Sequence, residues 1–428
     1  MAHPTIKIDT SIQTTKRGPP ADEEEGLEVL DDQDKPGLDE GDNEHVPPFL
    51  CQSALDIQRK FEDLEWIQRT RITEGTMAND PSHRWALEGD LEVKARNRYI
   101  GVQAWANSRI HLKVPEGECD FINASPIIMR DSVTQEESRY IATQGPKSGH
   151  LAYFWHMVFH ESTDVGVVVM LTQTFESGRE KCAQYFPLDA DESLPLYANE
   201  SDPYVNDEGH QKPSADDILG TVKLLECSFD ENSRSEVRKL ELTLGSQSKT
   251  VWHFLFAGWA DFSKPVGEDR EALLGLLKAS GSRCTPNNPR VVHCSAGVGR
   301  TGTFIALDHL LRELESGQLL TVTDAQDPVF ETVNQMREQR MMMVYNEMQL
   351  QFVYEVLREQ VNKKLGKTVD EDPGDSSNGG SQRSTKMAKL SNEDDCPPSS
   401  TPDPDHDTDR ASTSMRSWSG TPEDSDDE

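Results

Sequence analysis

The sequence predicts an α/β domain in which a mixed β-sheet is covered by helices on both faces. The run VGVVVMLT at 165–172 is apolar throughout and has the length of a strand, as expected for a strand buried on both sides. Other strand-like runs cluster along the chain and are flanked by runs with helical spacing. The chain has 428 residues, 35% of them hydrophobic, which is enough for one large domain or two smaller ones.

The expected elements follow from the spacing of apolar residues. A helix is expected at 148–161, directly before the buried strand. Further strands are expected at 221–229, 236–244, 250–259 and 290–295. Further helices are expected at 271–280, 303–316, 328–340 and 347–365. The segment VRKLEL at 237–242 fits a loose kinase-docking pattern, but a core strand is the better interpretation.

Both ends of the chain are predicted to be disordered, acidic extensions. Residues 1–48 and 366–428 are rich in Asp, Glu, Gly and Pro, and they lack the apolar content that offsets the entropy of ordering. The folded domain is therefore expected to span 49–365. Thr401 and Thr421 each precede a proline, which fits a kinase site and equally an unmodified, solvated tail.

Charge and cysteine content limit the classes of function. The formal net charge of −33 disfavours binding to nucleic acids or anionic membranes, because both repel an acidic protein. Seven scattered cysteines without CxxC spacing suit a reducing compartment and give no zinc pattern. The first residues, MAHPTIKIDT, have no apolar signal core, and no run of 18 apolar residues occurs. We expect a cytoplasmic protein, with entry into the nucleus left open.

The segment RVVHCSAGVGRTGTF at 290–304 carries the strongest chemical pattern. It combines a buried strand, a turn of small residues and the start of an amphipathic helix. The backbone amides of such a turn can surround an anion, and Arg300 adds a planar pair of donors for two phosphoryl oxygens. The residues that form this cradle between Cys294 and Arg300 are Ser295, Ala296, Gly297, Val298 and Gly299.

Cys294 is the predicted nucleophile of this loop. Cysteines near a helix N-terminus and a cation have pKa values of about 3.5–7.5, and the hydroxyl of Thr301 can donate to the thiolate. An ionised sulfur facing an anion cradle suits in-line attack on phosphorus, through a cysteinyl-phosphate intermediate. The alternative is a glycine-rich turn with an inert cysteine, because Cys-x5-Arg alone often occurs by chance. His293, the two glycines and the strand–loop–helix context favour the nucleophile.

HCSAGVGRTG resembles the signature of the cysteine-dependent protein tyrosine phosphatases. Further blocks in the family's order span about 270 residues. They are NRYIGVQAWANSRIHL (97–112), DFINAS (120–125), TQGP (143–146), KCAQYFP (181–187) and MREQRMMMV (336–344). The resemblance implies the cysteine-dependent phosphatase fold, with one catalytic domain built on a highly twisted mixed sheet. It is closest to the non-receptor, phosphotyrosine-specific type and similar to fungal members.

The resemblance also implies an activity and its partners. The reaction is hydrolysis of phosphotyrosine in proteins, which places the chain in signal transduction and needs no metal or other cofactor. The substrates would be phosphotyrosine-containing proteins, with mitogen-activated protein kinases as one partner class, and the enzyme would be a monomer. Dual-specificity and lipid phosphatases share Cys-x5-Arg but lack the NRY and TQGP blocks. A phosphotyrosine-binding protein without turnover is the non-enzymatic alternative.

Asp261, in GWADF, stands where the family has its general acid. It would protonate the leaving phenolate and then accept a proton from the hydrolytic water. The alternative is a solvated surface carboxylate. Ala260 stands where the family usually has proline, which predicts acid catalysis with altered loop kinetics and a lower kcat than in a proline-bearing homologue.

Several further residues receive roles from the resemblance. Tyr99 would line one wall of the phosphotyrosine pocket, while Gly101 stands where an Asp commonly anchors the peptide. Lys181 would approach the general acid or the phosphate, and Glu176 would orient Arg300. Lys181 and Glu176 also fit a solvated run of charges, and Tyr99 also fits core packing.

The glutamine loop departs from the family pattern. Gln349 matches its second glutamine, whereas Tyr345 replaces the first, which positions the hydrolytic water. We therefore expect phosphoenzyme breakdown to be slow. Ala260, Gly101 and Tyr345 favour the binding protein without turnover, and the presence of Cys294, Asp261 and Arg300 opposes it.

Overall fold

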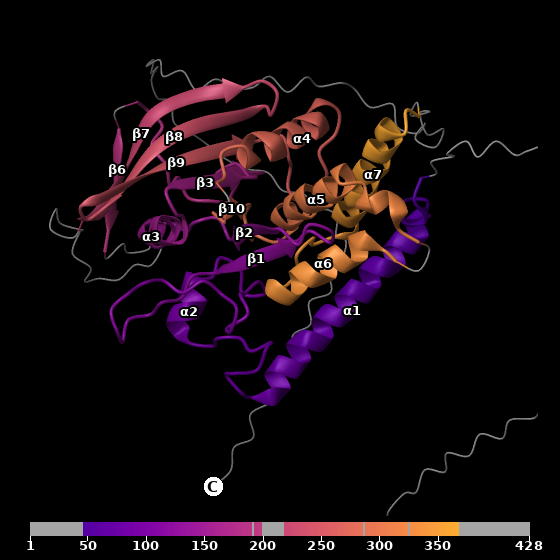
Figure 1. Ribbon diagram of the computed structural model, residues 1–428. Helices are drawn as coiled ribbons and strands as arrows, with labels where there is room; N and C mark the ends of the chain where they lie inside the picture. The colour runs from indigo at the N-terminus through magenta and orange to yellow at the C-terminus, as the bar shows by residue number, and fades with distance from the viewer. Residues whose placement is uncertain (1–45, 191, 199–217, 286, 324–325, 368–428) are drawn as a thin grey trace, which may run out of the picture. The chain divides into compact units, whose positions relative to one another are not determined.

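The computed structural model describes residues 46–190, 192–198, 218–285, 287–323 and 326–367 (Figure 1). These residues belong to one compact unit, Met1–Asp370. Almost all of the extensions predicted at 1–48 and 366–428, including Thr401 and Thr421, lie outside the described residues.

Eight strands of the described part form one mixed sheet. The second to fifth strands in spatial order are parallel to one another, and antiparallel strands extend the sheet on both sides of them. In spatial order they are β1 (Ala124–Arg130), β2 (Glu137–Thr143), β10 (Arg290–His293), β3 (Val165–Met170), β9 (Gln247–Phe256), β8 (Ser235–Leu244), β7 (Ile218–Asp230) and β6 (Ser193–Tyr197). The predicted strands at 165–172 and 290–295 are therefore confirmed, although both end earlier than expected.

Strand β3 shows why its sequence is apolar throughout. Val167 and Val169 face one hydrophobic core, and Val168 and Met170 face another on the opposite side of the sheet. Each residue of such a strand is buried, so no polar residue alternates with the apolar ones. The expectation of a sheet covered on both faces is confirmed.

Helices cover the two faces unequally (Figure 1). The larger core packs the sheet against most of the helices, while α3 (Leu151–Glu161) covers the other face. The helices on the larger core are α1 (Ala54–Ala78), α4 (Glu268–Gly281), α5 (Gly299–Glu315), α6 (Pro328–Gln339) and α7 (Glu347–Lys364). No helix of the described part is both long and apolar enough to cross a membrane.

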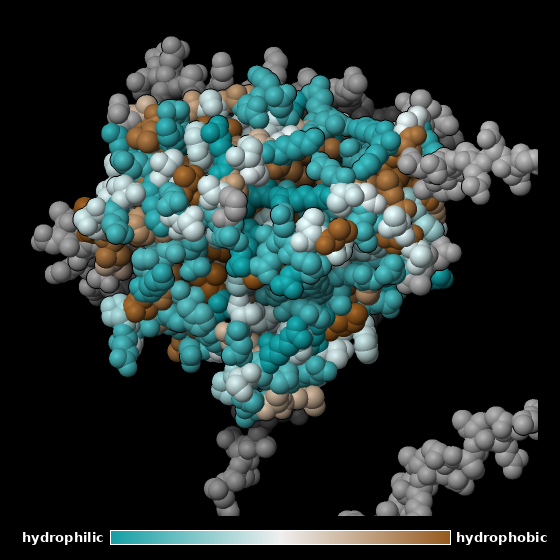
Figure 2. Space-filling view, in the orientation of Figure 1, coloured by the Kyte–Doolittle hydropathy of each residue, from teal (hydrophilic) through white to brown (hydrophobic). Residues whose placement is uncertain are grey.

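Short elements complete the described fold. Helix α2 (Leu91–Arg96) precedes the NRY block, and the hairpin of β4 (Phe175–Glu176) and β5 (Arg179–Glu180) carries Glu176 and directly precedes Lys181. Two 3-10 turns are η1 (Pro48–Leu50) and η3 (Gln318–Thr321). The face in Figure 2 is mostly hydrophilic, and its hydrophobic residues form separate small groups.

Helices α1 and α2 and strands β1, β2 and β6 were not predicted from the sequence. Helix α1 buries few apolar side chains, and polar Gln68 and Arg71 share its buried face, so its apolar stripe is sparse. A capping box of Ser53 and Asp56 starts this helix. Pro126 lies within β1, and proline in a run argues against a strand.

The interpretation of 237–242 as a core strand is confirmed. The segment lies in β8, where Leu240 and Leu242 are fully buried. Met341 and Met343 are buried in separate hydrophobic clusters.

Candidate active site

The loop 294–300 forms at the carboxyl end of the central strand β10, where α5 begins. Gly297 has φ +71°, and a Cβ placed on it would lie 2.1 Å from the carbonyl oxygen of Thr143, so only glycine fits this turn. Three carbonyl groups of the loop accept hydrogen bonds from residues outside the loop. The carbonyl of Val298 accepts hydrogen bonds from Val344 and Gly302, and those of Ala296 and Gly297 accept from Arg340.

Cys294 lies inside this loop and is 4% exposed. Burial acts to raise the Cys294 pKa, but the charge of Arg300 and hydrogen bonds from Thr301 and the Gly297 backbone outweigh it, so the pKa is lowered. The Thr301 hydroxyl has no nitrogen or oxygen partner among the described residues, which leaves it free to donate to the sulfur. The predicted nucleophile is therefore buried, and its environment favours the thiolate.

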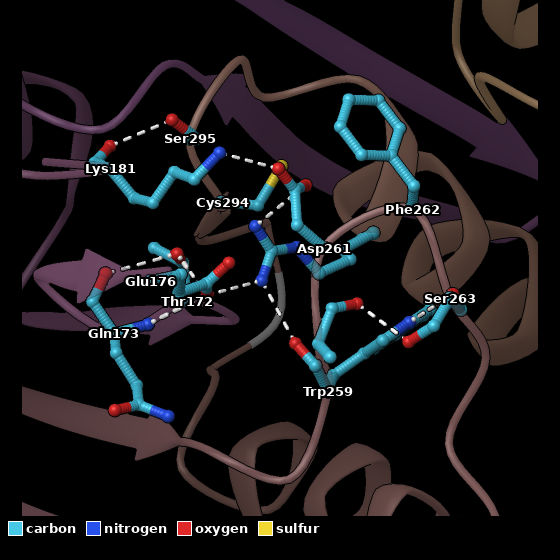
Figure 3. A network of polar contacts seen from close by, with 12 residues as sticks. Thr172, Gln173, Glu176, Lys181, Trp259, Asp261, Phe262, Ser263, Cys294 and Ser295 are labelled. Carbon is cyan, nitrogen blue, oxygen red and sulfur yellow. Dashed lines mark hydrogen bonds and ion pairs between the residues drawn. The ribbon is translucent and has the colours of Figure 1, made fainter. Parts of the chain in front are cut away.

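Arg300 lies in the first turn of α5, and its side chain is held in place by hydrogen bonds. Its Nη1 donates to Glu176 Oε1 at 2.6 Å and to the carbonyl oxygen of Trp259 at 2.9 Å (Figure 3). Glu176 is fixed in turn, because Oε1 also accepts from the Thr172 hydroxyl and the Gln173 amide. Glu176 therefore lies against the Arg300 guanidinium, a position from which it can orient Arg300.

Asp261 lies beside Cys294 in Figure 3, brought there by the loop that follows β9. One carboxylate oxygen lies 3.2 Å from Arg300 Nη2, and the other lies 2.5 Å from Lys181 Nζ. Trp259 is buried, and its indole nitrogen donates to the carbonyl of Ser263 across the loop. Asp261 is therefore not a solvated surface carboxylate.

Tyr99 connects a distant loop to the cradle. Its hydroxyl lies 2.8 Å from the Ser295 hydroxyl, which donates to the carbonyl oxygen of Lys181 at 2.9 Å. Tyr99 keeps 38% of its surface exposed, so its ring is accessible from solvent rather than packed in the core. A Cβ placed on Gly101 would meet nothing within 4 Å, so an acidic anchor would fit there but is missing.

His293 supports the loop through a buried chain of hydrogen bonds. Its Nδ1 donates to the carbonyl oxygen of Cys294 at 3.0 Å, so its Nε2 must accept from Tyr185. His253 Nε2 then donates to the same Tyr185 oxygen at 2.7 Å. Burial lowers the pKa of His293 to about 4 and that of His253 well below its usual value, so both rings are neutral.

Gln349 and Tyr345 approach the cradle from the start of α7. A Cβ on Gly299 would lie 3.0 Å from both amide atoms of Gln349 and 3.3 Å from Cβ of Tyr345. Gln349 Oε1 accepts from the Tyr345 amide at 3.0 Å, and the Tyr345 ring lies 5.9 Å from that of Phe262. Both predicted residues therefore lie at the loop, but Tyr345 directs its ring toward Phe262.

Two arginines that shape the site were not singled out from the sequence. Arg340 is fully buried and donates to the Ala296 and Gly297 carbonyls and to Asn123. Arg98 ion-pairs with Glu180 and holds the carbonyls of the 143–146 segment. Both lie inside the sequence blocks that resemble the family. An arginine in a sequence, however, does not indicate which carbonyl groups it contacts in the folded protein.

These residues place a lowered-pKa thiol in an amide cradle, beside a fixed guanidinium and a carboxylic acid, which is an arrangement suited to nucleophilic attack by sulfur on a phosphate ester. In the described part, no group of three or more His, Cys, Asp and Glu side chains is arranged to hold a metal ion.

Comparison with known proteins agrees with this chemistry. A family model described as "Protein-tyrosine phosphatase" matches residues 93–359. Tyrosine-protein phosphatase 1 of Saccharomyces cerevisiae is 34% identical over 326 residues, which cover 72% of this chain and 95% of that protein. The chain belongs to the protein-tyrosine phosphatase family.

Two further comparisons show the extent of the similarity. Tyrosine-protein phosphatase 2 of Schizosaccharomyces pombe is 35% identical over 323 residues, which cover 73% of this chain but 41% of that longer protein. The catalytic domain of human protein tyrosine phosphatase non-receptor type 18 has the same fold, with a TM-score of 0.55 at 24% identity. That match covers 72% of this chain and 96% of the human domain.

Proposed function

We propose that this chain hydrolyses phosphotyrosine in proteins through a cysteinyl-phosphate intermediate. The observation that carries the proposal is the convergence of Cys294, Arg300 and Asp261, where Asp261 comes from a separate loop and lies 3.2 Å from Arg300. A site that only binds phosphotyrosine needs the cradle and the arginine, but it has no use for a carboxylic acid held beside the nucleophile.

In the first step, the Cys294 thiolate attacks phosphorus. The S–P bond forms as the P–O bond to the tyrosine breaks, and Arg300 with the loop amides binds the non-bridging oxygens. The phenolate leaves with a pKa near 10, so it departs faster when Asp261 transfers a proton to its oxygen. Lys181 and Arg300 hold the Asp261 carboxyl group between them for this transfer.

In the second step, water attacks the phosphoenzyme. Asp261, now ionised, accepts a proton from the water while the S–P bond breaks and inorganic phosphate is released. Gln349, which lies against Gly299, is positioned to hold this water, and the Tyr345 hydroxyl takes the place of a second amide. The thiolate leaves readily because its pKa is lowered.

The pocket supports phosphotyrosine over shorter phosphoamino acids. The Tyr99 ring forms one wall at the level of Ser295, so a substrate must be long enough to carry its phosphate past this ring to Cys294. The proposed partners are phosphotyrosine proteins in signalling, with mitogen-activated protein kinases as one class. The proposed location is the cytoplasm, extending to the nucleus, and the proposed state is a monomer.

A hydrolysis assay tests the function. It compares the wild type, Cys294→Ser and Asp261→Ala on phosphotyrosine, phosphothreonine and phosphoinositide substrates. We expect turnover of phosphotyrosine alone, with both variants inactive but still able to bind the phosphopeptide. Turnover of phosphothreonine or phosphoinositide at a similar rate would indicate a dual-specificity or lipid phosphatase. Binding of phosphotyrosine by the wild type without turnover would show a binding protein instead.

A further inference from the structure

Helix α7 makes contacts with the Asp261 loop that the proposed chemistry does not use. Lys264, three residues after Asp261, places its Nζ 2.8 Å from both carboxylate oxygens of Glu355. At the start of the helix, the side-chain amide of Asn346 donates to the carbonyl oxygen of Phe262 at 3.2 Å. The loop is thus joined to α7 on both sides of Ser263.

The Lys264–Glu355 ion pair is partly shielded from water. The two side chains are 31% and 19% exposed, so their attraction is less screened than in a fully solvated pair. Glu355 is also held from α4, because Arg270 lies 3.7 Å from it and 2.8 Å from Glu359. The carboxylate that receives Lys264 therefore has a second cation beside it, from a helix outside the loop.

Asn346 is equally well fixed. It is the N-cap of α7, and its Oδ1 accepts from the Gln349 amide at 2.9 Å while its amino group faces Phe262. Phe262 has φ +58°, a left-handed conformation that is unfavourable for a bulky residue and persists only where neighbours hold it. The ring of Tyr345, 5.9 Å away, covers the same residue.

A loop with Ala260 has a particular need for such contacts. Alanine leaves the backbone before Asp261 more conformations than proline would, so more entropy is lost when the loop settles over the cradle. The loop supplies one restraint itself, since the Ser263 hydroxyl and amide both bond to the Ala260 carbonyl. The contacts with α7 supply restraints from outside the loop.

We propose that α7 holds the Asp261 loop over the cradle through the Lys264–Glu355 ion pair and the Asn346–Phe262 hydrogen bond. Lys264, Glu355 and Asn346 are thus positioning residues for the acid step. They touch neither phosphate nor Cys294, and they act by keeping Asp261 where it can donate its proton. This inference rests on the proposed function, because it assigns these residues to that reaction.

The test compares Lys264→Met with Lys363→Met. Lys363 also forms ion pairs, with Glu271 of α4 and with Glu359 one turn earlier in α7, and neither partner lies on the loop. For phosphotyrosine peptide, Lys264→Met should lower kcat/KM, which reports the steps up to phosphoenzyme formation, about two- to fivefold, while Lys363→Met should match the wild type. For an aryl phosphate with a strongly acidic phenol, which leaves without a proton, kcat/KM of Lys264→Met should also match that of the wild type.

Asn346→Asp supplies a second, independent variant. The aspartate still caps α7 by accepting from the Gln349 amide, but it cannot donate to the Phe262 carbonyl. We expect the same dependence on the leaving group as for Lys264→Met, and a larger loss when the two are combined. Unchanged unfolding midpoints in urea would show that the helix itself is intact.

Two results would overturn the inference while the proposed function stands. One is a Lys264→Met enzyme with wild-type kcat/KM for phosphotyrosine peptide. The other is an equal loss of kcat/KM for both leaving groups, which would mean general damage to the site rather than misplacement of the acid. If instead the wild type fails to hydrolyse either substrate, the proposed function is wrong, and the two failures are thereby distinguished.

Discussion

The carboxylate of Asp261 lies 3.2 Å from the guanidinium of Arg300, although the two residues are 39 positions apart. Trp259 makes this approach possible, because its side chain is buried and its carbonyl oxygen accepts from the same guanidinium. One arginine thus contacts the loop that carries the proposed acid and is also the proposed phosphate ligand. In the proposed reaction these two residues are therefore aligned by a shared contact.

Asp261→Asn keeps the shape of the side chain but removes the proton that it donates. We expect kcat for phosphotyrosine peptide to fall by about 10²- to 10⁴-fold, because the phenolate must then leave unprotonated. Steady-state kinetics across pH should show the loss of one limb of the bell-shaped kcat profile. A variant that keeps the full bell would exclude Asp261 as the acid.

Ala260→Pro should raise kcat by about two- to fivefold, since proline restricts the loop before it closes. The Ala260 carbonyl already accepts from the Ser263 hydroxyl at 2.8 Å, and proline keeps that acceptor. Ala260→Gly is the matched change in the opposite direction and should lower kcat. If neither substitution alters kcat or its pH profile, the loop backbone does not limit the rate.

Tyr345 is expected to slow the hydrolysis of the phosphoenzyme, because its hydroxyl reaches the water with a different geometry from an amide. Rapid mixing of wild type with a chromogenic aryl phosphate should therefore show a burst of phenol. Tyr345→Gln should reduce the burst and raise the steady-state rate about fivefold, the worth of one well-placed hydrogen bond. A linear wild-type progress curve with phosphoenzyme formation limiting would contradict this.

Arg340→Met should destabilise the fold and the cradle together. Burial lowers the Arg340 pKa to about 10, so the guanidinium remains charged at neutral pH and donates to Ala296, Gly297 and Asn123. Its removal leaves these buried acceptors unpaired, at a cost of about 3–5 kcal/mol in the free energy of unfolding.

Urea denaturation and inhibition by inorganic phosphate measure the two effects of Arg340→Met. Arg139→Met, at an exposed ion pair with Glu137, is the control and should change stability by less than about 0.5 kcal/mol. An Arg340→Met protein with wild-type stability and phosphate affinity would show that the cradle does not depend on the hydrogen bonds from Arg340.

Stability should decrease as the pH falls from 6.5 toward 4. The pKa of His293 is lowered to about 4, and that of His156 also to about 4, both mainly by burial. In this window the unfolded chain binds protons that the folded chain excludes, so each such histidine costs about 1.4 kcal/mol per pH unit. Carboxylates with lowered pKa, such as Asp131, lose their contribution only below about pH 4.

Urea unfolding at several pH values between 7.5 and 4.5 measures this slope. His156→Gln removes one titrating group from α3, far along the chain from the cradle, and should make the slope shallower by one proton. A free energy of unfolding that stays constant over the window would show that these histidines protonate in the folded state.

The cradle could be predicted because its residues are contiguous. Cys294, Arg300 and the small residues between them determine a local turn, and the following helix begins within it, so few distant contacts are needed. Asp261, Lys181 and Glu176 are not contiguous with the cradle, and only their motifs identified them. Strand β3 could be predicted equally well, because a strand that is buried on both faces has a continuous run of apolar residues.

By itself the sequence determined the class of fold and the departures at Ala260, Gly101 and Tyr345, and it predicted the nucleophile and the anion cradle. Only the tertiary structure decided what supports them. Arg340 acts on carbonyls 44 positions away, and Lys264 meets Glu355 at a separation of 91. Such pairs leave no local pattern in the sequence, because each residue alone is an ordinary charged side chain. The packing of the sheet and α7 brings the two partners together.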